Sequence, residues 1–178
     1  QDIDFNLLSP ISLSILCDYI IELDINKVEE VSNYFMLNYE DSELLWKAFK
    51  AKSYNLQNKG KNNELISLID EAQARFGADA YMGWAQLMKA NANYELQNFS
   101  QADKDYELII GIRDWKGALH AEAWFKRGLC REKIGELENA HSFYQRTYLL
   151  FRGYSDGLWA AKAYLAAANI LQELGRIE

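Results

Sequence analysis

The stretch that decides the fold runs Ala121-Glu-Ala-Trp-Phe-Lys-Arg-Gly128 and is followed by Gly135, Ala140 and Tyr144. A tryptophan precedes a glycine by four positions, and an alanine precedes a tyrosine by four, so each couple shares one face of a helix. Small side chains at Gly128 and Ala140 would let two helix backbones approach closely. The stretch therefore predicts two antiparallel helices that touch at their small residues and are joined by a turn at Gly135.

Residues of the same kind recur at nearly constant offsets along the chain, which indicates an internal repeat. We call each set of equivalent positions a column. The small position of the first helix recurs at offsets of 37, 38 and 40 residues, as Ser53, Ala90, Gly128 and Ala168. The turn position gives Gly60, Gln97, Gly135 and Gly175. The second helix repeats at offsets of 37, 37 and 38 as Val28, Leu65, Ala102 and Ala140, with Ser32, Ile69, Tyr106 and Tyr144 four residues later.

The apolar periodicity and the polar or glycine-containing breaks predict helices throughout the 178 residues. We expect helices near 10–23, 25–38, 42–58, 62–76, 80–97, 99–113, 118–134, 137–152 and 157–174. Each pair is too small to bury its apolar face alone, so stacking on neighbours must supply the core. Trp115, in the link between the third and fourth pairs, is expected to plug the seam between them. The prediction is a single all-α domain over 1–178.

These residues resemble the tetratricopeptide repeat (TPR) family, most fully over 118–178, whereas before residue 60 only the periodicity supports the repeat. The resemblance implies an α-solenoid in which antiparallel helix pairs stack as a right-handed superhelix. The sequence departs from the family in its repeat length, which exceeds the usual value of about 34. Arg127 and Arg131 replace the expected Leu and Tyr, and the only proline is Pro10. Glycines at 77, 111 and 153 are expected to stop helices by adopting a left-handed conformation.

The charge and the apolar runs disfavour two classes of partner. A formal net charge of −7 opposes binding to phosphate backbones. The longest apolar run, 13–23, is interrupted by Ser14 and Asp18 and is shorter than the roughly 18 residues that a membrane span needs. We therefore expect no nucleic-acid partner and no membrane insertion of this segment.

The sequence has few residues that could form a catalytic or metal site. His120 and His141 are the only histidines and fall on different expected helices, and His141 is expected to be exposed. Cys17 and Cys130 lie far apart in apolar surroundings, which indicates buried free thiols. The sequence therefore predicts no catalytic residue, no metal and no cofactor. An enzyme domain would require chemistry supplied from outside this segment.

In the TPR family, the first helices of successive pairs line a concave groove that binds peptides. Carried over by position, the resemblance assigns the groove to Lys47, Lys50, Tyr54, Trp84, Leu87, Asn91, Tyr94, Phe125, Leu129, Lys162 and Asn169. The mixture of aromatic, aliphatic, amide and lysine side chains suits an extended or helical ligand with hydrophobic anchors. The aliphatic members could equally pack between helices. Asn91 and Tyr94 are expected to be replaceable with little change in melting.

The resemblance implies a non-catalytic scaffold that binds a protein or peptide in this groove. The alternative is a structural element that assembles with itself. The expected helix 157–174 has no partner after it, so we expect a fragment of a longer array or a second copy covering this end as a homo-oligomer. Residues 118–178 are also similar to multi-repeat TPR proteins of bacterial envelopes, which points to a periplasmic or envelope location.

Overall fold

The computed structural model describes residues 4–77, 83–112, 117–153 and 157–176. Its contacts divide the chain into two compact units, 1–78 and 79–178. That the two units form a single domain stays a prediction. Two predictions lie outside the described residues: the helix start at residue 80 and the position of Trp115. The expected helix start at residue 157 lies at the edge of a described range.

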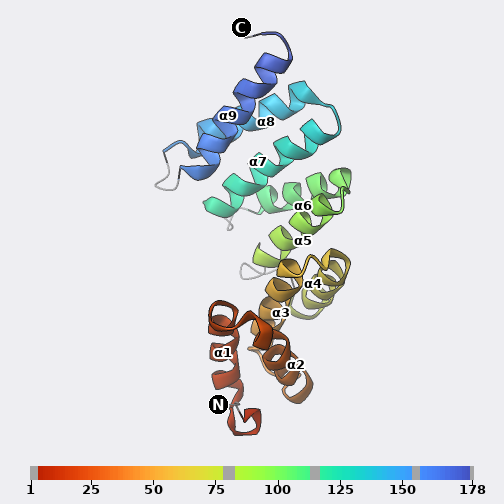
Figure 1. Ribbon diagram of the computed structural model, residues 1–178, viewed down its shortest axis with the longest axis vertical. Helices are drawn as coiled ribbons and strands as arrows, with labels where there is room; N and C mark the ends of the chain where they lie inside the picture. The colour runs from red at the N-terminus through yellow and green to blue at the C-terminus, as the bar shows by residue number, and fades with distance from the viewer. Residues whose placement is uncertain (1–3, 78–82, 113–116, 154–156, 177–178) are drawn as a thin grey trace. The chain divides into compact units, whose positions relative to one another are not determined.

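All regular structure in the described residues is helical (Figure 1). Unit 1 contains two 3-10 turns and four α-helices: η1 (Phe5–Leu7), α1 (Pro10–Leu23), η2 (Ile25–Lys27), α2 (Val28–Asn38), α3 (Trp46–Asn58) and α4 (Asn62–Phe76). Unit 2 contains α5 (Gly83–Glu95), α6 (Phe99–Gly111), α7 (Ala118–Lys133), α8 (Leu137–Phe151) and α9 (Leu158–Glu173). The predicted order of helices is confirmed.

Two helices begin later than the periodicity predicts. Residues 42–45 form turns in which the backbone N–H of Ser42 donates to the Tyr39 carbonyl and the Ser42 hydroxyl accepts from the Leu44 N–H at 3.2 Å. Before α2, the Asp24 carboxylate accepts from the Asn26 N–H at 3.1 Å and holds a 3-10 turn. In both places a short polar side chain competes with the helix for backbone N–H groups.

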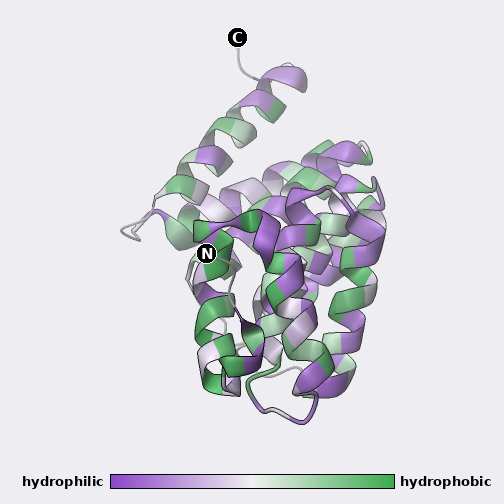
Figure 2. Cartoon of the chain, turned by 60° about the horizontal axis from the view of Figure 1, so that its bottom comes forward, coloured by the Kyte–Doolittle hydropathy of each residue, from purple (hydrophilic) through white to green (hydrophobic). Residues whose placement is uncertain are grey.

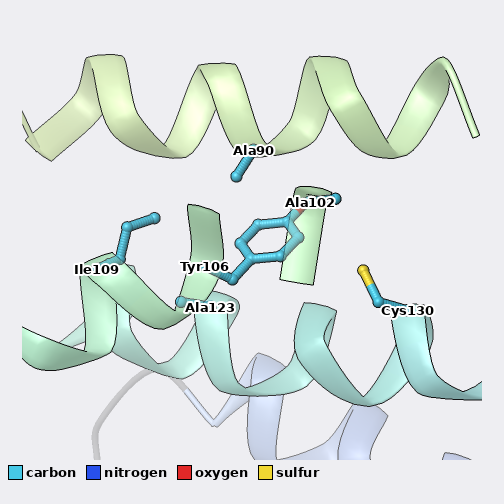
Figure 3. Packing of buried hydrophobic residues seen from close by; sticks show 6 residues of the cluster. All are labelled: Ala90, Ala102, Tyr106, Ile109, Ala123 and Cys130. Carbon is cyan, nitrogen blue, oxygen red and sulfur yellow. The ribbon is translucent and has the colours of Figure 1, made fainter. Parts of the chain in front are cut away.

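The repeated columns are the places where paired helices meet. Tyr106 and Tyr144 are fully buried, as are Ser32 and Ile69 in the same column. The ring of Tyr106 lies between Ala90 on α5 and the α7 helix (Figure 3). At Gly128, a Cβ atom would stand only 2.4 Å from Cε1 of Tyr144, so no larger residue fits without displacing the ring. Hydrophilic and hydrophobic bands alternate along the helices, as amphipathic stacking requires (Figure 2).

The two arginines that depart from the family pattern lie in an ion-pair network between α6 and α7. The Arg127 guanidinium donates from Nε to Asp103 at 2.8 Å and forms an ion pair with Glu107 at 3.0 Å. Arg131 pairs with the same Asp103 carboxylate and with Glu136. The side chains of Asp103 and Arg127 are 8% and 10% exposed, so the network replaces apolar packing at this seam.

The predicted turn column has one shared backbone conformation. Its members have positive φ angles of 66°, 61°, 81° and 68°, at Gly60, Gln97, Gly135 and Gly175. Gly77 also ends α4 with a positive φ of 78°, as expected, but Gly111 and Gly153 do not have positive φ. Gly111 is the last residue of α6, and the extended Ile112 caps that helix instead, so those two predictions were wrong.

Gln97 is the only non-glycine residue with positive φ in the described part of the chain. A side chain in the left-handed region costs about 1 kcal/mol, so Gln97→Gly is expected to raise the free energy of unfolding by up to about 1 kcal/mol. Urea denaturation of the variant and the wild type measures this difference in the free energy of unfolding. Lys104→Gly, at an exposed helical position of α6, should instead lower stability by about 1 kcal/mol. A loss of stability in both variants would contradict the interpretation.

Candidate functional site

The first helices of the pairs pack on one another within each unit. In unit 1, α1 contacts α3, and in unit 2, α5 contacts α7 and α7 contacts α9. The predicted groove residues lie on these helices, so we call their shared surface in each unit its first-helix face. The predicted residues fall on two such faces, one per unit.

The first-helix face of unit 1 holds a cavity of about 260 Å³ between α1 and α3. Two predicted groove residues, Lys50 and Tyr54, line it together with Cys17, Asp18, Ile21 and Glu22. The sequence reasoning missed the four α1 residues. Counting 37 residues back from Tyr54, which is one repeat offset, reaches Cys17, so extending the column by one repeat would have found this wall.

The cavity combines opposite charges with apolar surface. Lys47, a predicted groove residue, donates its ammonium to the Asp18 carboxylate and lies 5.8 Å from the Trp46 ring centroid. It is therefore already paired within the face. Burial raises the pKa of the Cys17 thiol to about 12, with a further rise from the Asp18 carboxylate. Cys17 stays protonated at neutral pH and contributes an apolar wall, since a thiol without its thiolate is a poor nucleophile.

On α5, the predicted residues belong partly to the packing. Asn91 accepts a hydrogen bond from the buried Tyr106 hydroxyl at 2.6 Å and reaches Glu122 at 3.5 Å. Replacing Asn91 would leave that hydroxyl unpaired, so the hydrogen bond argues that an Asn91 variant melts at a lower temperature, against the expectation from the sequence. Tyr94 packs edge-on against Phe99 at 5.3 Å, with the Lys126 ammonium 5.2 Å from its ring centroid.

The other predicted residues of unit 2 differ in exposure. Trp84 and Leu87 are half-buried on α5, and Leu87 packs against the Tyr106 cluster. Phe125 is 8% exposed and stacks against Tyr144 and Trp159. Leu129 packs against the same cluster.

On α9, Lys162 and Asn169 are exposed, as is Leu165 between them. The face thus changes from closed packing at Phe125 to exposed side chains on α9, where the Lys162 ammonium lies 4.4 Å from the Trp159 ring centroid.

A second cavity, of about 380 Å³, lies between α8 and α9 and is hereafter the α8–α9 groove. Its walls are mostly apolar, formed by His141, Gln145, Tyr148, Leu149, Tyr164, Ala167, Ala168 and Leu171. His141 was predicted to be exposed, but it is half-buried, and its Nε2 atom is shielded from solvent and has no hydrogen-bond partner in the described structure. The prediction was wrong because His141 shares with Gln145 and Tyr148 the side of α8 that faces α9 across the groove.

A third depression, of about 530 Å³, lies beside α2, α3 and α4 and is mainly polar. Its charges are compensated locally. Lys59 pairs with Glu29 and thereby lowers the pKa of that carboxyl, and Lys61 pairs with Glu64. This depression has no concentrated charge or apolar anchor with which to select a ligand.

Two further properties concern membranes and metals. Within the described ranges, no helix has both the length and the hydropathy of a membrane span. Nor do three or more His, Cys, Asp or Glu side chains gather in those ranges where they could hold a metal ion.

Comparison with known proteins supports the fold. No family model and no curated protein matches the sequence. Among solved structures, the chain is similar to a protein of Podosopora anserina described as a putative kinesin light chain with nearly identical TPR-like repeats, at a TM-score of 0.71 and 13% identity over 96% of this chain and 90% of that one. A single-residue variant of that protein gives a TM-score of 0.71 and 11% identity over 98% and 90%. This protein therefore has the all-helical fold of the TPR-like repeats.

Proposed function

We propose that this protein is a non-catalytic scaffold that binds a peptide segment of another protein on its first-helix faces, with the α1–α3 cavity as an anchor pocket. The observation that carries the proposal is this cavity of about 260 Å³, because two residues that the resemblance assigns to the groove line it. The resemblance to the TPR family supports the proposal, because it implies that this side of the first helices binds peptides.

The lining indicates what the pocket would hold. Ile21, the Cys17 thiol and the Tyr54 ring offer apolar contact, whereas Glu22 and Lys50 offer one charge of each sign. Such a pocket suits one hydrophobic side chain of a peptide, with the flanking backbone or a polar neighbour bound at the rim. Tyrosine is enriched among residues that dominate binding energy, so Tyr54 is the expected anchor contact.

Peptides selected from a displayed random library on the immobilised protein provide the test. The double variant Lys50→Ala/Tyr54→Ala is expected to weaken the selected peptides at least about tenfold, since loss of an anchor tyrosine costs more than about 1.4 kcal/mol. Isothermal titration calorimetry measures the affinities.

The matched control is Lys104→Ala/Leu108→Ala, which removes an exposed lysine and an exposed apolar side chain from α6, a second helix. It should leave the affinity unchanged. If no peptide is enriched, or if both double variants bind alike, the anchor pocket is refuted.

Self-association is a second candidate function because α9 presents apolar side chains to solvent. Tyr164 is 59% exposed and Leu165 is 63% exposed. Contiguous exposed apolar surface is characteristic of interaction sites. Association of copies through α9 would cover this surface.

A further inference from the structure

Exposed apolar side chains concentrate on two parts of the molecule. Ten of the thirteen large hydrophobic residues exposed in the described chain lie on η1 and α1 or on α8 and α9. On α1 they form a row four residues apart, opposite the buried face: Ile11, Ile15, Tyr19 and Leu23, hereafter the α1 stripe. On α8 and α9 two of them, Leu149 and Tyr164, line the α8–α9 groove.

The repeat itself shows what such a groove accepts. In the α5–α6 pair, the small residue Ala90 is covered by Tyr106, and in the α7–α8 pair, Gly128 is covered by Tyr144. The corresponding residue of α9 is Ala168, which is half-buried and lines the α8–α9 groove. No side chain of the described structure fills the space above it. The groove therefore has room for an aromatic or branched side chain from another helix.

The hydroxyl of each covering tyrosine also has an acceptor on the first helix. Tyr106 donates to Asn91, one residue after Ala90, and Tyr144 donates to Glu132, four residues after Gly128, both at 2.6 Å. On α9, the corresponding positions are Asn169 and Gln172, whose side chains are exposed. An incoming tyrosine would thus find amide acceptors at the two places that serve this role within the chain.

The charges near the two surfaces are complementary. Residues 4–24, which include α1, carry four carboxylates and no lysine or arginine, and one of the four, Asp18, is already paired with Lys47. Residues 137–176, which include all of α8 and α9, carry four basic and three acidic side chains, of which Arg176 and Glu138 pair with each other. Opposite charges favour encounter and orientation of the two surfaces, whereas like surfaces would repel.

We infer that a second copy of this chain docks its α1 stripe in the α8–α9 groove, with Tyr19 or Ile15 above Ala168. This inference rests on self-association as the second proposed function and names its two surfaces. One contact covers both exposed apolar surfaces, and it leaves the cavity between α1 and α3 to a different set of residues. Because the two surfaces differ, the contact is heterologous, and copies add to one another until a ring closes or a filament grows.

Two variants that each block one surface test the inference. Ala168→Glu places a carboxylate in the groove against the acidic α1, and Ile15→Lys places an ammonium on the stripe, where docking would desolvate it against the mostly apolar walls of the groove. Sedimentation velocity should show that the wild type associates with rising concentration, whereas each variant stays at the monomer mass of 20.6 kDa. Each change is expected to weaken association at least about tenfold.

The equimolar mixture of the two variants gives the sharper result. Ala168→Glu retains its stripe and Ile15→Lys retains its groove, so the mixture should form a complex of two chains that cannot grow further. The control Leu108→Lys, at an exposed position of α6, should associate as the wild type does. Circular dichroism melts check folding, and Tyr164→Glu, at an exposed groove residue, replaces Ala168→Glu if that variant unfolds.

The outcomes distinguish self-association in general from the specific contact between the α1 stripe and the α8–α9 groove. A monomeric wild type at all concentrations overturns both self-association and this inference. Association of the wild type with a mixture that stays monomeric, or with variants that associate normally, overturns the α1-to-groove contact alone. Peptide binding at the α1–α3 cavity is measured separately and is unaffected by either result.

Discussion

Asp103→Ala is expected to lower the free energy of unfolding by about 3 kcal/mol, because it leaves two guanidinium groups without their shared carboxylate. Arg127 is 10% exposed and its Nε–H donates to Asp103 at 2.8 Å, so this charge cannot be hydrated in place. Arg131 loses the same partner. Urea denaturation of the variant measures the loss.

Two ion pairs remain in Asp103→Ala. They keep the expected loss of unfolding free energy below the largest losses that follow when a buried ion pair is broken. Arg127 retains Glu107, although that side chain is 63% exposed and its attraction is screened by water. Arg131 retains Glu136. A triple change of Asp103, Arg127 and Arg131 to leucine, leucine and methionine should cost much less than Asp103→Ala, because no buried charge is left unpaired. Glu107 and Glu136 lose their partners, but their side chains are 63% and 42% exposed and stay hydrated.

The control for Asp103→Ala is an ion pair at the surface. Glu138 pairs with Arg176, and both side chains are more than half exposed. Glu138→Ala should therefore cost less than about 1 kcal/mol. Equal losses for Glu138→Ala and Asp103→Ala would show that burial of the network contributes nothing.

Gly128→Ala is expected to lower the free energy of unfolding by about 2 kcal/mol. The added methyl group would lie 2.4 Å from Cε1 and 2.6 Å from Cδ1 of Tyr144. This ring cannot move freely, because it packs against Phe125 and its hydroxyl donates to Glu132 at 2.6 Å. The strain outweighs the gain in helix propensity of about 1 kcal/mol that alanine brings over glycine.

Gly111→Ala serves as the control for Gly128→Ala. Gly111 ends α6 without positive φ, and an added Cβ there meets nothing within 4 Å. Its replacement should leave stability unchanged or raise it slightly. If Gly128→Ala were as stable as Gly111→Ala in urea, close contact of α7 with α8 would not be the reason for a glycine at that position.

Spacing predicted the helices and their turns, and the family resemblance added the α-solenoid, because each repeated position has a local cause. The turn column has positive φ even where the residue is Gln97, so position in the repeat, more than residue type, sets that conformation. Spacing failed where side chains compete with the backbone, as at Ser42, whose hydrogen bonds delay α3. No hydrophobic pattern records such a bond.

The candidate site was predicted only in outline. The resemblance assigned Lys50 and Tyr54 to a groove, and in the structure both line a cavity between α1 and α3; that this cavity binds a peptide stays a prediction. It could not show that Asn91 binds Tyr106 or that Lys47 pairs with Asp18, because both contacts join residues on different helices. The sequence identifies which face a residue lies on, whereas hydrogen bonds between helices determine whether it is free to bind a ligand.

In the described structure, extensive contacts join each helix only to the next one or two along its unit. Contacts between residues close in sequence are formed without closing long loops, which favours fast folding. Local opening of one helix releases only its immediate neighbours. Amide hydrogen exchange should accordingly be slowest in α7, which packs against α5, α6, α8 and α9, and faster in α9, which packs against α7 and α8.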